Sequence, residues 1–218
     1  WENTETLFAD VLRKYPRVAV AHNNMGRYYR EQNQYDKAIA SYNKALEINP
    51  EGYNTFSNRG KAYFDLGRMD EALRDFDRSI ELNGEYVEAR SNRGAAFAAT
   101  GRFEEALADL NIALNLEPHN TNALSNRSLT WYSMNNFEKA VEDITTYLRY
   151  KPDDADMLNL RSLSYNQMNR DQEALTDLNR ALQLMPSQGI FWQNRSFLLN
   201  KLGDRTGALR DIRQAEAL

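Results

Sequence analysis

The segment SNRGKAYFDLGRMDEALRDF, which runs from Ser57 to Phe76, decides the fold because the chain contains two close copies of it. The copies are SNRGAAFAATGRFEEALADL, beginning at Ser91, and SNRSLTWYSMNNFEKAVEDI, beginning at Ser125. The three segments start 34 residues apart. A fixed period of this length is typical of proteins built from one small supersecondary unit repeated along the chain. The sequence therefore predicts an array of similar units.

Composition narrows the possible functions. The chain has 218 residues, 42% of them hydrophobic and 27% charged, which is enough for a buried core. The net charge is −4 and no basic block is present, so nucleic acid is not an expected partner. The absence of cysteine excludes disulfides and thiolate sites. No apolar window is long enough to predict a membrane span within this chain. Because the first residue is Trp1, we interpret the chain as part of a longer protein.

Six repeats follow one another in register when Ala19 is taken as position 1. They span residues 19–52, 53–86, 87–120, 121–154, 155–188 and 189–218. Position 20 is always alanine and position 8 is always glycine or serine, so two helices of one repeat can approach closely. Position 15 is always glycine or asparagine, which tolerate the left-handed conformation that ends a helix. Each repeat is therefore expected to be an antiparallel helix pair.

This pattern resembles the tetratricopeptide repeat family over residues 19–218. Residues 1–18 fit the second helix of a truncated repeat, with Phe8 at position 24 and Pro16 at position 32. The resemblance implies an all-α fold, a right-handed superhelical solenoid of antiparallel helix pairs whose first helices line a concave groove. It also implies a non-catalytic protein-interaction scaffold that binds a partner protein or an extended peptide.

Two positions change together and predict ion pairs. Position 7 is Met25 in the first repeat and arginine in the other five, whereas position 23 is Ser41 in the first repeat and aspartate in the other five. A guanidinium group suits a carboxylate bidentately, so we expect each arginine to bind the aspartate of its own repeat. The predicted structural pairs are Arg59–Asp75, Arg93–Asp109, Arg127–Asp143, Arg161–Asp177 and Arg195–Asp211.

Position 6 predicts a row of amides. It is asparagine in five repeats, Asn24, Asn58, Asn92, Asn126 and Asn194, and Leu160 in the other. The series resembles the asparagine ladder of nucleocytoplasmic glycosyltransferases, where a carboxamide can bond both halves of a peptide group. The alternative is that these asparagines only bond the adjacent helix. Arg27 and Lys61 at position 9, with Tyr132 at position 12, complete the expected peptide-binding set. Position 5 carries no lysine, so a carboxylate clamp for chaperone tails is not expected.

The sequence predicts no cofactor, metal or catalytic site. His22 and His119 have no partner at ligand spacing, and no phosphate loop or nucleophile–base motif is present. Tyr147 and Leu160 replace usual residues where the fourth and fifth repeats meet, which predicts an irregular superhelical step there.

Two alternatives to the scaffold stay open. The opening WENTETLFADVLRKYP resembles the stretch after the last span of multi-pass glycosyltransferase-like proteins, in which the repeats would recruit an acceptor outside the cytoplasm. Bare terminal repeats would instead favour self-association. The compartment, extracytoplasmic or cytoplasmic, also stays open.

Overall fold

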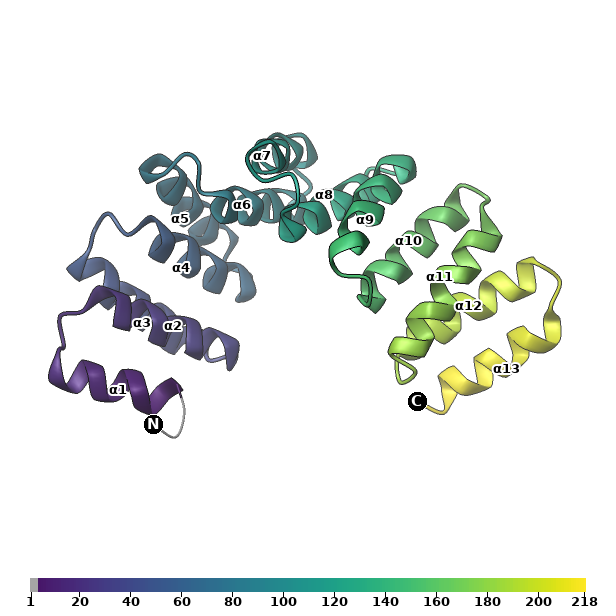
Figure 1. The fold of residues 1–218 in the computed structure, drawn as a ribbon, viewed down its shortest axis with the longest axis horizontal. Helices are drawn as coiled ribbons and strands as arrows, with labels where there is room; N and C mark the ends of the chain where they lie inside the picture. Colours follow the sequence, from purple (N-terminus) through teal and green to yellow (C-terminus); the bar gives the residue numbers. More distant parts are fainter. Residues whose placement is uncertain (1–3) are drawn as a thin grey trace. The chain divides into compact units, whose positions relative to one another are not determined.

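A computed structural model describes residues 4–218 and contains thirteen helices and no strand within them (Figure 1). The predicted all-α array of helix pairs is confirmed. Residues 1–3, which belong to the opening stretch WENTETLFADVLRKYP, lie outside the described part. The helix of the truncated repeat, α1, spans Thr4–Lys14. No helix in the described range combines the length and apolar character needed to cross a bilayer.

The first helix of every repeat begins at the first residue of its 34-residue period. These helices are α2 (Ala19–Glu31), α4 (Tyr53–Asp65), α6 (Val87–Ala99), α8 (Thr121–Ser133), α10 (Ala155–Gln167) and α12 (Gly189–Lys201). The second helices are α3 (Tyr35–Ile48), α5 (Met69–Leu82), α7 (Phe103–Leu116), α9 (Phe137–Tyr150), α11 (Asp171–Leu184) and α13 (Arg205–Glu216).

A left-handed residue joins the two helices of every pair. The φ angle is +57° at Asn33, +58° at Asn135 and +56° at Asn169. It is +73° at Gly67, +76° at Gly101 and +91° at Gly203. The prediction for position 15 is therefore confirmed in all six repeats. Glycine and asparagine occur there because other side chains make this conformation costly.

Residue 8 of each first helix sets how closely the second helix can pack. A Cβ atom added to Gly26 would lie 2.5 Å from the Tyr42 ring, and one added to Gly60 would lie 2.7 Å from the Phe76 ring. Tyr42 also packs against Ala62 of the next repeat, within a buried cluster. The residue at position 24 therefore fills the space both within a repeat and between successive repeats.

The chain forms two compact units that divide between Glu117 and Pro118. Unit 1 holds α1–α7, the truncated repeat and the first three full repeats. Unit 2 holds α8–α13, the last three repeats. Within each unit, the second helix of one repeat packs on the first helix of the next, as α3 does on α4 and α9 on α10.

The junction between α9 and α10, where an irregular step is expected, lies inside unit 2. Tyr147 is buried there, and its hydroxyl donates a 2.6 Å hydrogen bond to Asp154. The other carboxylate oxygen of Asp154 caps α10 by accepting the Met157 N–H. Burial, together with this bond, raises the pKa of Tyr147. The bulky ring thus has a specific polar partner, and the irregular step stays a prediction.

Candidate peptide-binding face

The structure joins every position-7 arginine to the aspartate of its own repeat. In each of the five pairs, Nε and Nη2 of the guanidinium donate to the two carboxylate oxygens over 2.6–2.8 Å. The five aspartates are buried and the five arginines are half-buried. These residues hold the two helices of a repeat together, so we assign them to the fold and not to ligand binding.

Four of these arginines also bind the preceding repeat through Nη1. The acceptors are Asn43 for Arg59 at 2.6 Å, Asp77 for Arg93 at 2.8 Å, Thr145 for Arg161 at 3.2 Å and Asn179 for Arg195 at 2.8 Å. All four acceptors occupy position 25, and sequence reasoning missed this bond. The detectable signal was a short polar residue at position 25 whenever the next repeat carries arginine at position 7.

The first repeat lacks the ion pair and contains a hollow in its place. Met25 and Ser41 line it, with Leu12, His22 and Lys37. His22 has a structural contact here, because its Nε2 donates to the carbonyl oxygen of Pro16 over 2.9 Å. No cluster of three or more possible metal ligands occurs in residues 4–218.

The side of the first helices that carries positions 6, 9 and 13 is called the ladder face below. Positions spaced by three and four residues lie on one side of a helix. All five position-6 asparagines are half-buried. Asn24, Asn58 and Asn92 belong to unit 1, whereas Asn126 and Asn194 belong to unit 2. The face is therefore described in each unit separately.

Three asparagines of the ladder face bond the preceding repeat. Nδ2 of Asn58 donates to Oδ1 of Asn23 over 3.0 Å, and Nδ2 of Asn194 donates to Oδ1 of Asn159 over 2.8 Å. Asn92 lies 3.5 Å from the Ser57 hydroxyl, a weaker contact. The adjacent-helix role that the sequence left open is thus present. A carboxamide has two N–H donors and an oxygen with two lone pairs. One bond to the preceding repeat therefore leaves one N–H and the oxygen able to form further hydrogen bonds.

The remaining residues of the predicted binding set differ in exposure. Arg27 is exposed and Lys61 is half-buried on the ladder face of unit 1. Tyr132, in unit 2, is half-buried and packs edge-on against Phe137 at 5.5 Å between ring centres. Sequence reasoning missed Tyr42, whose ring packs beside Gly26 of α2 in unit 1 and which is taken up below with Arg30.

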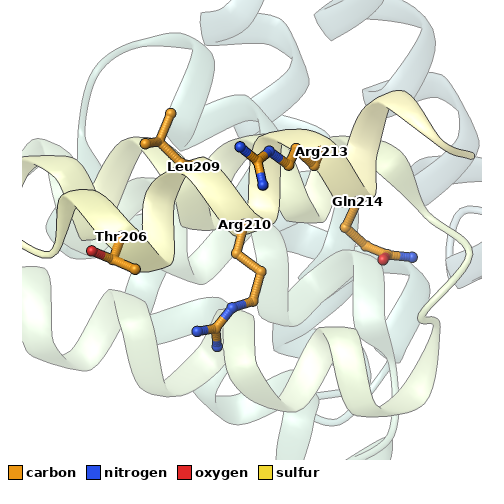
Figure 2. Close-up of a pocket in the computed structure, with 5 residues that line it drawn as sticks. All are labelled: Thr206, Leu209, Arg210, Arg213 and Gln214. Atoms are coloured by element: carbon orange, nitrogen blue, oxygen red, sulfur yellow. The ribbon is translucent and has the colours of Figure 1, made fainter.

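The outer side of α13 forms a second surface feature. Thr206, Leu209, Arg210, Arg213 and Gln214 line a hollow along this helix (Figure 2). Leu209 is 58% exposed, and Ile212 beside it is 42% exposed. Ile212 occupies position 24, which is fully buried in the other five repeats. Arg213 occupies position 25, where the preceding repeats carry a short polar acceptor.

All four family models that match the chain describe the same kind of repeat. Family models described as TPR repeat or tetratricopeptide repeat match residues 7–40, 26–67, 57–122 and 94–164. Together these matches run from residue 7 to residue 164. No curated protein matches the chain.

Solved structures show the same fold. A chain of the APC/C hetero-tetramer Cut9-Hcn1 has a TM-score of 0.87 and 15% identity, over 99% of this chain and 43% of that one. PilW, a type IV pilus biogenesis factor, has a TM-score of 0.84 and 18% identity, over 91% and 92% of the two chains. A tetratricopeptide repeat protein from Parabacteroides merdae has a TM-score of 0.71 and 20% identity, over 98% and 84%. The chain thus spans less than half of the Cut9-Hcn1 chain that it matches, and identities this low support the fold alone.

Proposed function

Because this chain belongs to the tetratricopeptide repeat family, we propose that it is a non-catalytic scaffold whose ladder face binds an extended segment of a partner protein. Repeat arrays of this kind offer long surfaces made of many similar helices. The finer part of the proposal is the mode of binding, which we assign to the position-6 amides.

The carboxamide oxygens support this assignment. Within residues 4–218, the oxygens of Asn58, Asn92 and Asn194 accept no hydrogen bond, while one N–H of each amide points to the preceding repeat. That bond fixes the orientation of the amide, which lowers the entropy lost when a ligand binds. Each oxygen is then ready to accept a backbone N–H of a ligand.

The spacing of the amides fits an extended chain. Packed helices lie about 8–10 Å apart, and an extended peptide rises about 3.3 Å per residue. One amide of the ladder face therefore meets a ligand backbone every two to three residues. Recognition through the backbone places few demands on the ligand side chains, so we expect a range of partner sequences.

A display library of linear peptides tests the proposal. Peptides selected on the wild-type chain should bind the double variant Asn58→Ala/Asn92→Ala at least tenfold more weakly. Asn23→Ala is the matched control, since it removes the inter-repeat acceptor of Asn58 but leaves the ladder amide in place. Equal binding by wild type and the double variant would refute the ladder. If Asn23→Ala lost as much affinity for the peptides as the double variant, the amides would have a structural role and not a ligand-binding one.

Self-association through α13 is a second candidate, favoured by the exposed Leu209 and Ile212. Light scattering should then give a mass that rises with concentration, and Leu209→Glu should return it to that of a single chain. A constant single-chain mass would exclude this candidate. The membrane-enzyme context has no observation in its favour, and we do not propose it.

A further inference from the structure

We propose that unit 1 contains an anion subsite, formed by Arg27, Arg30, Lys61 and the hydroxyl of Tyr42, which binds one carboxylate of the ligand peptide. The inference rests on the proposed peptide-binding function and adds the chemistry of one ligand group. Its evidence is a group of three cations and one hydroxyl on α2, α3 and α4, in which the buried Arg30 Nε and the Tyr42 hydroxyl have no hydrogen-bond partner in the described part of the chain.

The hydroxyl of Tyr42 is the first of these groups. The residue has 0% exposure, and its hydroxyl has no hydrogen-bond partner in the described part of the chain. A buried polar group without a partner is costly. Phe76 occupies the equivalent position 24 in the next repeat and is equally buried. The hydroxyl is thus unnecessary for packing, which indicates another reason for its presence.

Arg30 supplies the second unsatisfied group. Its Nη1 lies 3.4 Å from Oδ2 of Asp65, a long contact, and its buried Nε has no partner among the described residues. The guanidiniums of Arg30 and Arg27 act on the Tyr42 hydroxyl and oppose the burial that raises its pKa to about 12. The Tyr42 ring packs beside Gly26, which is next to Arg27 and one turn before Arg30 on α2, so the hydroxyl and the two guanidiniums come from adjoining parts of α2 and α3.

Lys61 supplies the third. Its ammonium is half-buried and forms no ion pair or hydrogen bond within residues 4–218. Burial, and then the positive charge of Arg30, lower the pKa of Lys61, while Asp65 offsets part of this effect. A lowered pKa means that the folded protein disfavours the charged ammonium. An anion at this point would favour it again.

These features occur together in only one place along the chain. Position 9 is a cation in the first two repeats and is Ala95, Leu129, Leu163 or Phe197 in the others. Position 24 carries a hydroxyl only at Tyr42. The hydroxyl is dispensable, Arg27 and Lys61 have no ion pair within residues 4–218, and the carboxylate contact of Arg30 is 3.4 Å long; together these features indicate one recognition site.

The local charge selects the kind of anion. Glu31 and Asp65 also act on this cluster, so the three cations are left with one net positive charge. A single carboxylate matches that charge and is an acceptor-only group with two oxygens, which suits guanidinium, ammonium and hydroxyl donors. The carboxylate belongs to an acidic side chain or to the carboxyl terminus of the ligand.

Peptides selected on the full chain, as described above, provide the test. Each is made in four forms: as selected, with Asp and Glu replaced by Asn and Gln, with an amidated carboxyl terminus, and with both changes. Fluorescence anisotropy gives the Kd of each form for wild type, Tyr42→Phe, Lys61→Gln and the control Lys44→Gln. Lys44 is an exposed lysine of α3.

Neutralising the recognised carboxylate should raise the wild-type Kd about tenfold, and the form responsible identifies its source. The increase should fall below threefold in Lys61→Gln and Tyr42→Phe but persist in Lys44→Gln. Peptides that bind wild type equally well in all four forms would overturn the subsite while leaving the ladder intact. The subsite would also be overturned if neutralising the carboxylate raised the Kd as much in both Lys61→Gln and Tyr42→Phe as in wild type. Failure to select any peptide would instead refute the underlying function.

Discussion

At the scale of single residues, the position-7 arginine acts as a three-way link. Arg161, for example, binds Asp177 on α11 with two bonds and Thr145 on α9 with a third. A buried ion pair adds little stability over an apolar pair, but losing one partner is costly. The link therefore serves mainly to fix which helices pack together, because a shifted register would leave the buried Asp177 unpaired.

The first repeat offers a way to test this link by building it. Met25→Arg alone should lower stability by about 1–3 kcal/mol, because the new charge lacks a carboxylate. Adding Ser41→Asp should recover most of that loss, since the hollow beside Met25 has room for the side chains. Urea unfolding of the two single variants and the double variant gives the coupling energy. Ser41→Asn is the matched control, and recovery by asparagine as well would contradict an ionic link.

Lys61 is expected to lower stability in the absence of ligand. Lys61→Leu, which copies position 9 of the fourth and fifth repeats, should raise the Tm at neutral pH by about 1–3 °C. The ammonium is disfavoured only while it is charged, and its pKa lies below the ordinary value of 10.5. The destabilisation is therefore complete at neutral pH and disappears as the pH rises through this lowered pKa to 10.5. Thermal melts between pH 7 and 10.5 should show the two Tm values converging, and a constant difference would contradict this account.

At the scale of helices, position 8 decides how each pair packs, and its two residue types predict opposite responses. Gly60→Ala would bring a Cβ to 2.7 Å from Phe76, so we expect a loss of about 1–2 kcal/mol after allowing for the better helix propensity of alanine. Ser162→Ala removes a buried hydroxyl that has no partner in the described range. It should leave stability unchanged or raise it by about 0.5 kcal/mol. Both variants place alanine at position 8, so their thermal melts can be compared directly. A shift of the two Tm values in the same direction would contradict the packing account.

The helix pairs were predictable because their determinants repeat within the chain. Position 15 recurs in six repeats, and positions 7 and 23 carry arginine and aspartate together in five repeats but neither residue in the first. The repeats can therefore be aligned with one another like related sequences. The bond from Arg59 to Asn43 was harder to see, because a long guanidinium can reach several neighbours and a short polar residue on a helix surface is common. Tyr42 was missed for a different reason. Tyrosine and phenylalanine pack equally well, so only coordinates reveal that the hydroxyl is buried without a partner.

At the scale of the whole molecule, the chain divides into two units between Glu117 and Pro118. Both units carry amides of the ladder face, whereas the anion subsite lies in unit 1 and the exposed side of α13 lies in unit 2. Stability in repeat arrays is roughly a sum of repeats and their nearest-neighbour contacts. Each unit contains three helix pairs, the number of repeats from which such arrays become stable.

Two fragments test whether binding follows this division. Residues 1–117 and 118–218, produced separately, should each give a helical circular dichroism spectrum and a cooperative melt, because each contains three stacked helix pairs. Residues 1–117 should keep the preference for carboxylate-bearing peptides. Residues 118–218, which contain their own position-6 asparagines but no cation at position 9, should bind without that preference and so act as the control. A folded 1–117 fragment that binds peptides without distinguishing acid from amide would contradict the assignment of the anion subsite to unit 1.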